Sequence, residues 1–408
     1  MLNPNIKYLK CSLCEKHFPI DQLMNLCPVD NRPLEIIYDL AAIKEKGNWY
    51  HPEIKSMWRF SGILPINEDY KDFGEGFTPL LNYNDHQIAQ KYGFELFVKD
   101  EGKGHDGYGQ NPTLSFKDRG MAMVINMAKH FDLDKLVVPT QGNAGDSLAF
   151  YSNKTGVQAT IIMPDDTPMP IQGSVAALSF HNPNIKLEMV KGTIKEAGEL
   201  MKSKYIPKGY FNVATFQEPG WRIDGKKTMG LELAEPNNMS DKWELPDVVL
   251  YPTGGGTGIL GMWKAFDELE ALGMIDSKRP KIIAVQSQAT QPITTAYDNQ
   301  TFEPVPTKAG QTLAVGLNVA GGVGHFKVLD IVRKSGGISI AMSEDEIAIN
   351  LSQVWQEKHW WICPETAACI AALKPLAQQR VIKKNDQVVV FNTGSFEKYL
   401  PDVRHLLL

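Results

Sequence analysis

The sequence predicts an α/β protein whose parallel sheets are divided between two domains. From about residue 130 onward, short apolar runs alternate with helical stretches, which is typical of right-handed βαβ units. Continuous Val and Ile runs fit strands that are covered on both faces, as parallel strands are. The number of these units exceeds what one sheet of ordinary width holds. We therefore expect two open, twisted α/β domains.

The individual elements follow the same alternation. Residues 141–156 are interpreted as a turn that leads into a helix, a second helix runs through 171–180, and a third begins at Thr193. The buried strands are expected at 135–140, 157–164, 185–192, 211–216, 247–252, 281–286 and 387–394. Residues 101–113 are polar and rich in glycine, which predicts a loop that is a candidate for mobility.

Composition disfavours several classes of protein. The 408 residues include 42 Lys and Arg against 47 Asp and Glu, a net charge of −5, which gives no electrostatic footprint for nucleic acid or an anionic membrane. No apolar run approaches the roughly 18 residues of a membrane span, and the polar start does not resemble a signal peptide. Five cysteines in a chain this long do not indicate a disulfide framework, so we expect a reducing, cytoplasmic environment.

A glycine-rich loop at 252–258 is the first candidate site. An apolar strand precedes it and a helix follows, an order in which backbone N–H groups and a helix N-terminus bind a phosphate. The candidate residues are Gly254, Gly255, Gly256, Thr257 and Gly258. The alternative is a tight connection between strand and helix.

Two other phosphate ligands are disfavoured. A dinucleotide would need an acidic residue at the end of the next strand, where Gln286 stands. A nucleotidase loop at 220–226 would need Ser or Thr next, and Lys227 occupies that position.

A lysine lies at the start of another predicted helix. Residues 111–120 read Asn-Pro-Thr-Leu-Ser-Phe-Lys-Asp-Arg-Gly and precede an apolar-periodic stretch. Ser115 can cap this helix, which places Lys117 in its first turn. Because a positive environment and partial burial favour the neutral amine, Lys117 is a candidate nucleophile toward a carbonyl. A surface lysine could occupy this position equally well.

Two further turns follow expected strands. The glycine-rich backbone of 141–147 can offer N–H groups to a substrate carboxylate, although Asn143 considered alone would be an ordinary helix N-cap. After the strand that ends near 390, Thr393 and Ser395 lie in a Thr-Gly-Ser turn, and most such turns have no chemical role.

Together these pieces resemble one family. The lysine motif and the loop Pro-Thr-Gly-Gly-Gly-Thr-Gly are similar to those of the fold-type II pyridoxal 5'-phosphate (PLP) enzymes, the tryptophan synthase β-like family, and most closely to its threonine synthases. The similarity continues, in the family's order, through 74–81, 98–102, 139–152, 222–233, 364–373 and 391–395.

The resemblance implies a cofactor and its ligands. PLP would lie in the cleft between the two domains, with Lys117 as the catalytic lysine that binds its aldehyde. Asn143 would bond the phenolic oxygen, the glycine loop the phosphate, and Thr393, a better match than Ser395, the pyridine nitrogen.

The resemblance also implies a reaction. Threonine synthases convert O-phospho-L-homoserine and water to L-threonine and phosphate by γ-elimination followed by water addition at Cβ. A second anion site is then required, with Arg222 as the best candidate and Lys226 and Lys227 as weaker ones. We expect Ser115, Gln141 and Gly142 to bind substrate, Asp118 and Arg119 to position the Lys117 turn, and loop 101–111 to close over the substrate.

Two departures from the family leave an alternative open. The glycine loop lacks the asparagine that some threonine synthases carry, and Leu114 stands where glycine is common. A PLP-dependent serine/threonine ammonia-lyase (dehydratase) is therefore the alternative function. A silent relative that only binds a ligand in the same pocket is the third hypothesis.

The N-terminal residues suggest a zinc-ribbon-like segment. Cys11 and Cys14 form a Cys-x-x-Cys pair, and Cys27 precedes Asp30 at the same spacing, so these four are candidate ligands of a structural zinc. The alternative is a vestigial ribbon held by its apolar residues. Cys363 and Cys369 are expected in the core.

The predicted organisation has three parts. The ribbon-like segment covers 1–45, a large PLP-binding α/β domain covers 46–107 and 219–408, and a smaller α/β domain covers 108–218. The family also implies a homodimer.

Overall fold

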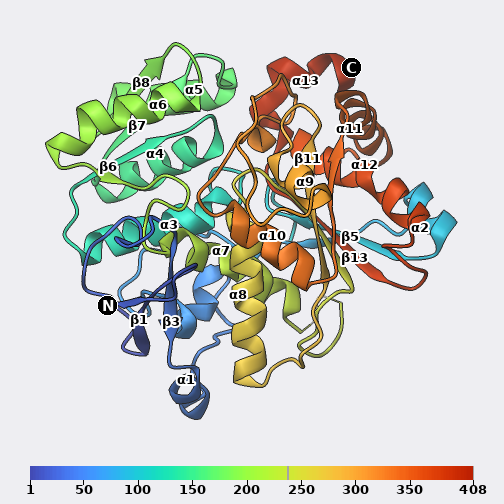
Figure 1. The fold of residues 1–408 in the computed structure, drawn as a ribbon, viewed down its shortest axis with the longest axis horizontal. Helices are drawn as coiled ribbons and strands as arrows, with labels where there is room; N and C mark the ends of the chain where they lie inside the picture. Colours follow the sequence, from blue (N-terminus) through green and yellow to red (C-terminus); the bar gives the residue numbers. More distant parts are fainter. Residues whose placement is uncertain (237–238, 408) are drawn as a thin grey trace. The chain divides into compact units, whose positions relative to one another are not determined.

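The protein was examined as a computed structural model that describes residues 1–236 and 239–407, and it divides into two compact units (Figure 1). Unit 1 comprises Met1–Gly76, Asn111–Thr228 and Glu397–Pro401. Unit 2 comprises Phe77–Gln110, Met229–Phe396 and Asp402–Leu408. Both units are mixed α/β structures, which confirms the predicted fold class. Because 46–76 group with unit 1, the units differ from the expected domains, whose boundaries stay a prediction.

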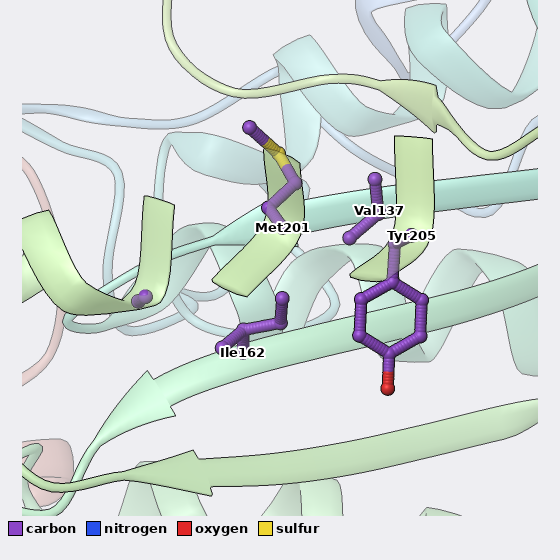
Figure 2. Packing of buried hydrophobic residues seen from close by; sticks show 5 residues of the cluster. Val137, Ile162, Met201 and Tyr205 are labelled. Atoms are coloured by element: carbon purple, nitrogen blue, oxygen red, sulfur yellow. The ribbon is translucent and has the colours of Figure 1, made fainter. Parts of the chain in front are cut away.

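Unit 1 contains a four-stranded parallel sheet in the order β8-β7-β6-β9. Helices α4, α5 and α6 pack against it, and a cluster of Val137, Ile162, Ala197, Met201 and Tyr205 fills the space beneath α6 (Figure 2). The elements are α3 Lys117–His130, β6 Lys135–Pro139, α4 Asn143–Thr155, β7 Gln158–Pro164, α5 Met169–His181, β8 Ile185–Val190, α6 Ile194–Leu200, η2 Met201–Tyr205, η3 Ile206–Lys208 and β9 Phe211–Asn212.

The N-terminal part of unit 1 is a small antiparallel ribbon in the strand order β2-β1-β3. This pairing differs from the parallel pattern of the α/β sheets, because hairpin-like turns rather than helices connect its strands. The ribbon consists of β1 Ile6–Cys11, β2 His17–Phe18 and β3 Leu34–Tyr38, and α1 Leu40–Lys46 and η1 Met57–Ile63 follow it.

Unit 2 contains a six-stranded sheet in the order β12-β11-β10-β13-β5-β4. Neighbouring strands are parallel except β4, which pairs antiparallel with β5. The elements are β4 Leu80–Asn82, α2 Gln87–Tyr92, β5 Glu95–Asp100, β10 Val248–Pro252, α8 Thr257–Leu272, β11 Lys281–Ser287, α9 Pro292–Asp298, η4 Val315–Leu317, α10 His325–Lys334, β12 Ser339–Met342, α11 Glu344–Lys358, α12 Pro364–Gln378 and β13 Gln387–Asn392.

Three elements lie where the chain passes from one unit to the other or close to such a point. These are α7 Trp221–Ala234, η5 Phe396–Tyr399 and α13 Leu400–Leu407. Within the described residues, no helix is long and apolar enough to cross a membrane.

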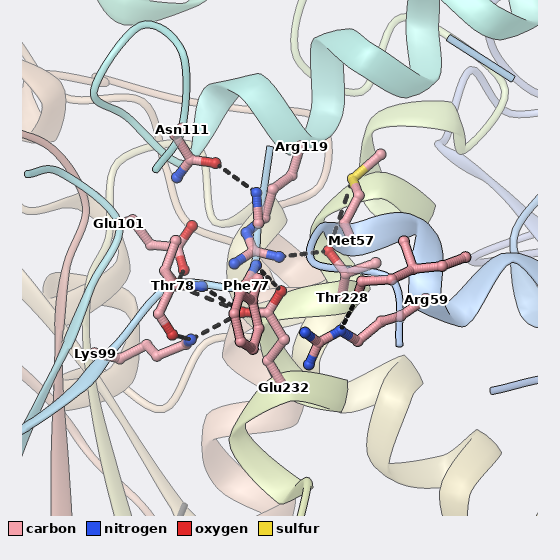
Figure 3. Close-up of polar contacts among 12 residues, drawn as sticks. Met57, Arg59, Phe77, Thr78, Lys99, Glu101, Asn111, Arg119, Thr228 and Glu232 are labelled. Carbon is pink, nitrogen blue, oxygen red and sulfur yellow. Dashed lines mark hydrogen bonds and ion pairs between the residues drawn. The ribbon is translucent and has the colours of Figure 1, made fainter. Parts of the chain in front are cut away.

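Each unit contains a buried polar contact near α7. In unit 1, Arg119 Nη1 donates to Thr228 Oγ1 at 2.9 Å, and in unit 2 the Lys99 amine pairs with Glu232 at 2.8 Å (Figure 3). Both members of the Lys99–Glu232 pair are almost fully buried, so removing one would leave an uncompensated charge.

The backbones of α3 and α7 approach each other closely in unit 1. A Cβ on Gly225 would lie 2.1 Å from the carbonyl oxygen of Arg119. A Cβ on Gly120 would lie 3.2 Å from Lys226 Cε and 3.4 Å from Arg222 Cβ. Glycine at 225 is therefore required by a contact between two main chains, which cannot move aside as a flexible side chain can.

This contact makes Gly225 sensitive to substitution. We expect Gly225→Ala to lower the free energy of unfolding by about 3 kcal/mol, because the added methyl group must push α3 and α7 apart. Gly198→Ala is the matched control, since a Cβ on Gly198 of α6 has nothing within 4 Å and should stabilise by up to about 1 kcal/mol. Urea unfolding of both full-length variants measures the difference, and equal effects would contradict the close contact.

Candidate active site

The candidate catalytic lysine begins helix α3. Phe116 stands at the cap position and makes no side-chain hydrogen bond. Ser115, the residue before it, caps the first turn as expected: its Oγ accepts the backbone N–H of Lys117 at 3.2 Å, and its side chain is fully buried. The first turn of the helix thus holds Lys117 half-buried, as expected.

A buried carboxylate fixes the turn before Lys117. Asp118 accepts the backbone N–H of Thr113 at 2.6 Å and its hydroxyl at 2.7 Å, and Ser147 Oγ bonds the same carboxylate at 2.5 Å. Burial raises the pKa of Asp118 to about 6, and the hydrogen bond from Ser147 opposes this rise. The carboxylate therefore ties the lysine turn to α4 and supports the positioning role expected for Asp118.

Leu114 adopts a conformation that glycine usually takes. Its φ angle is +54°, in the left-handed region. The chain therefore keeps a glycine-like turn at this position in spite of the side chain, at a cost in backbone strain of about 1 kcal/mol.

Two amines lie beside one aromatic ring in unit 1, and the guanidinium of Arg222 lies near one of them. The amines of Lys117 and Lys226 lie 4.6 Å and 4.7 Å from the centroid of the Phe116 ring. Lys226 and Arg222 are buried. Burial, followed by the charges of Lys117 and Arg222, lowers the pKa of Lys226 well below its usual value. Burial and the neighbouring positive charges therefore favour the neutral amine of Lys226.

One carboxyl group lies close to these cations. Glu218 Oε2 accepts the backbone N–H of Arg222 at 3.1 Å. Burial raises the pKa of Glu218 to about 7, against the opposing charge of Arg222. A carboxyl that titrates near neutrality compensates the guanidinium of Arg222 only in part.

Two nitrogen atoms of the Arg222 guanidinium have no hydrogen-bond acceptor among the described residues. Its Nη1 donates to the carbonyl of Val213 at 2.9 Å, whereas Nε and Nη2 are buried and make no hydrogen bond among the described residues. Buried guanidinium donors are rarely left without an acceptor. Two donors on one planar fork suit a phosphoryl group.

Asn143 is the first residue of α4, and Gly142 rather than Asn143 occupies the N-cap position. The Asn143 amide donates to the hydroxyl of Tyr399 at 3.2 Å, and its oxygen is buried with no partner among the described residues. Gln141 and Gly142 are half-buried in the turn between β6 and α4, where Gly142 N–H donates to Thr140 Oγ1 at 3.1 Å. The helix start therefore carries an amide that is held at one end only.

In unit 2 the glycine loop connects β10 to α8. A Cβ on Gly254, Gly256 or Gly258 would lie within 2.4 Å of Gly316 O, Val328 Cγ2 or Tyr251 Oη, respectively. Gly256 has a φ of +81° and forms the N-cap of the 16-residue helix α8. The loop therefore brings bare main chain to a helix N-terminus, where N–H groups lack intrahelical acceptors.

The side chain of His325 contacts the backbone of this loop. Its Nε2 lies 3.0 Å from the carbonyl oxygen of Gly254, and a hydrogen bond there requires the tautomer with the proton on Nε2. Burial lowers the pKa of His325 to about 4. No local motif predicts this role, because 71 residues separate the two partners.

Thr393 lies at the same edge of the sheet as the glycine loop. Strands β10 and β13 are parallel neighbours, and the loop and Thr393 follow their carboxyl ends. The Thr393 hydroxyl is 3.5 Å from Cys363 Sγ, which is buried in the core as predicted. Open α/β sheets bind ligands at such edges, where neighbouring connections leave in opposite directions.

The side chain of Gln286 is occupied by hydrogen bonds to the protein backbone, which agrees with the prediction that it does not bind the ribose of a dinucleotide. Its amide donates to the carbonyl of Thr253 at 3.1 Å and accepts the N–H groups of Ile293 and Thr294 at 2.9 and 3.0 Å. The side chain joins the glycine loop to the start of α9.

The structure also brings the four candidate metal ligands together. The ligand atoms of Cys11, Cys14, Cys27 and Asp30 all lie within 4.8 Å of one another.

Glu218 and His325 are the site residues that sequence reasoning missed. Their burial and long-range partners became visible only in the fold.

The buried histidine makes the stability of the protein depend on pH. The unfolded chain binds a proton at the ordinary pKa of 6.5 and the folded chain at about 4, so this contribution to stability is lost as the pH falls between these values. Between pH 7 and pH 5, the wild type should lose about 2 kcal/mol more than His325→Gln, which can still donate to Gly254. Urea unfolding at both pH values measures this, and the exposed His405→Gln should behave like the wild type.

Comparison with known proteins identifies the family. A family model described as "Pyridoxal-phosphate dependent enzyme" matches residues 71–394. The chain is 29% identical to a threonine synthase of Methanocaldococcus jannaschii, over 94% of this chain and 91% of the relative. It is 28% identical to a threonine synthase of Methanosarcina acetivorans, over 96% of this chain and 92% of the relative.

Solved structures share the fold. A threonine deaminase of Solanum lycopersicum matches with a TM-score of 0.61 and 23% identity, over 81% of this chain and 88% of that one. An L-serine ammonia-lyase of Rhizomucor miehei matches with a TM-score of 0.63 and 17% identity, over 81% of this chain and 97% of that one. The family model covers well over half of the residues, so the chain belongs to the pyridoxal-phosphate-dependent enzymes.

Proposed function

We propose that the protein is a threonine synthase, which converts O-phospho-L-homoserine and water to L-threonine and phosphate. The observation that carries this proposal is the group of Lys117 and Lys226, whose amines lie beside the Phe116 ring, and Arg222, whose charge acts on Lys226. A substrate with a phosphoryl group brings two negative charges to cations that otherwise repel one another. Threonine synthases among the relatives, which align over more than nine-tenths of the chain, support the same assignment.

The chain's residues fit PLP, the cofactor that the family implies. The unpartnered oxygen of Asn143 lies at the start of α4, and the glycine loop leaves no space for side chains at the start of α8. We assign Lys117 to the cofactor aldehyde, Asn143 to the phenolic oxygen, Gly254–Gly258 to the phosphate and Thr393 to the pyridine nitrogen. When bound, PLP supplies an aldehyde that captures amines and a ring that delocalises charge developing on the substrate's carbon atoms.

Each side chain then has a defined task. The free amine of Lys117 would move protons at Cα and Cβ of the substrate. Arg222, with Lys226, holds the phosphoryl group until it leaves, and Ser115, Gln141 and Gly142 bind the substrate's carboxylate end. Thr393 offers a neutral hydroxyl to the ring nitrogen, which favours elimination and replacement over transamination. Closure of loop 101–111 would exclude water; it contains no strand or helix.

A serine/threonine ammonia-lyase is the second candidate. The deaminase and ammonia-lyase structures share the fold, and the glycine loop at 254–258 carries no asparagine. Incubation with O-phospho-L-homoserine should release phosphate and threonine in equal amounts. Formation of a keto acid and ammonia from serine or threonine, without phosphate release, would favour the lyase instead. A homodimer and a cytoplasmic location remain predictions.

Lys117 is the residue on which both candidate activities depend. We expect Lys117→Ala to abolish the visible absorbance of the bound cofactor and to lower turnover at least 1,000-fold, roughly the contribution of a general base. Borohydride reduction of the wild type should leave a stable cofactor adduct on the peptide that contains Lys117, detectable by mass spectrometry. Lys129→Ala, at the exposed far end of α3, is the control and should retain activity. Retained turnover in Lys117→Ala would reject the assignment.

Arg222 separates a phosphorylated substrate from serine or threonine. We expect Arg222→Gln to lower kcat/KM for O-phospho-L-homoserine about 100-fold, because two charge-assisted hydrogen bonds are lost. Inhibition by inorganic phosphate should weaken in parallel. The exposed Arg404→Gln is the control.

Loss of Arg222 also leaves Glu218 without its positive neighbour, which could unfold the site. The double variant Arg222→Gln/Glu218→Gln removes that charge and should fold, as circular dichroism would verify. Unchanged phosphate kinetics in a folded variant would reject the anion site.

A further inference from the structure

The ribbon contains two turns of the same backbone shape. The N–H of Cys11 donates to the carbonyl five residues on, Lys16, at 2.9 Å, and the N–H of Cys27 donates to Arg32 in the same way at 2.9 Å. The residue after the second candidate ligand has a positive φ in both turns, +58° at Glu15 and +57° at Asn31. Asp30 therefore occupies in the second turn the position that Cys14 occupies in the first.

The two turns face each other through their ligand atoms. The sulfur atoms of Cys14 and Cys27 are 3.7 Å apart, and Cys11 Sγ is 3.3 Å from each oxygen of Asp30. A tetrahedral zinc with ordinary bond lengths separates two sulfur ligands by about 3.8 Å and a sulfur from an oxygen by about 3.5 Å. The spacing matches a zinc site and exceeds the roughly 2.05 Å of a disulfide bond.

Backbone N–H groups orient these ligands further. Leu13 N–H lies 3.4 Å from Cys11 Sγ, and Arg32 N–H donates to Asp30 Oδ1 at 3.1 Å. Such bonds are typical of the outer shell of a metal site, where they fix the ligands and stabilise their negative charge. Cys11 and Cys27 are fully buried, and Cys14 is exposed.

We propose that Cys11, Cys14, Cys27 and Asp30 bind one structural Zn²⁺. Thiolate ligands select zinc over hard cations such as magnesium, and zinc accepts a carboxylate oxygen as its fourth ligand. Four protein ligands leave no open position for a substrate or an activated water molecule. The site is therefore structural, and it is independent of the proposed function.

The metal would stabilise the ribbon where it packs on the rest of unit 1. Asn25, two residues before Cys27, donates from its amide to the carbonyls of Asn212, at 2.9 Å, and Gln217. A Cβ on Gly220 would lie 2.9 Å from the carbonyl oxygen of Leu34 in β3. The ribbon thus contacts both the end of β9 and the residue that precedes α7, so loss of the metal should loosen this region.

Metal analysis of the full-length protein tests the proposal. After purification without chelators and with zinc supplied, elemental analysis should give one Zn²⁺ per chain. Cys14→Ser is the main variant, because Cys14 is exposed and its replacement should not disturb the core; it should reduce bound zinc at least tenfold. The exposed Asp21→Asn, in the same ribbon, and the buried Cys369→Ala are matched controls that should retain one zinc. A wild-type protein without stoichiometric zinc, or full zinc in Cys14→Ser, would overturn the site.

Cobalt tests the identity of the ligands. Protein reconstituted with Co²⁺ alone should show the intense visible bands of tetrahedral cobalt and a near-ultraviolet thiolate band, and Asp30→Asn should shift the visible bands or lower affinity at least tenfold. An unchanged spectrum and affinity in Asp30→Asn would exclude Asp30 as a ligand. Thiol titration of the metal-free, denatured chain should give five free thiols, and three would indicate a Cys14–Cys27 disulfide and contradict the proposal.

Discussion

The close contact between the backbones of α3 and α7 is the constraint on which the chemistry of unit 1 depends. Glycine at 225 lets the two helices touch without intervening side chains, and Gly120 lies at the same contact, since a Cβ on Gly225 would be 3.1 Å from its Cα. The contact brings Lys226 and Arg222 beside the start of α3, where Lys117 lies. Burial and the charges of Lys117 and Arg222 disfavour a charged Lys226, and the nearby Glu218 opposes this only in part. Binding of an anion near these cations would therefore be favourable.

In unit 2, the parallel sheet positions the glycine loop and Thr393. The glycine loop and Thr393 follow the carboxyl ends of two neighbouring parallel strands, so the sheet itself sets their spacing. Two side chains hold the loop: Gln286 bonds one loop carbonyl and His325 another.

Much of the fold could be predicted, and the reasons are physical. The strands β6, β7, β10, β11 and β13 are buried Val- and Ile-rich runs, which periodicity identifies. The short strands β4, β9 and β12 carry too little pattern: β4 and β12 are not among the predicted strands, and β9 covers two of the six residues predicted. The six-residue strand β5 is also absent from the prediction. The glycine loop and the lysine turn could be located because their chemistry depends on local sequence. The roles of Glu218 and His325 depend on burial and on partners distant in sequence, which no local motif encodes.

Tyr38, in the last strand of the ribbon (β3), packs against an ion pair on α7. The Tyr38 hydroxyl donates to Asp224 at 3.2 Å, its ring lies 4.2 Å from the Lys227 amine, and Lys227 pairs with Asp224 at 3.1 Å. Both charged side chains are completely buried, and the aromatic ring of Tyr38 helps to shield them from solvent. A homologue that begins downstream of this strand would expose the pair to solvent. Lys227, Asp224 and the ribbon should therefore be gained and lost together during evolution, as one inherited module.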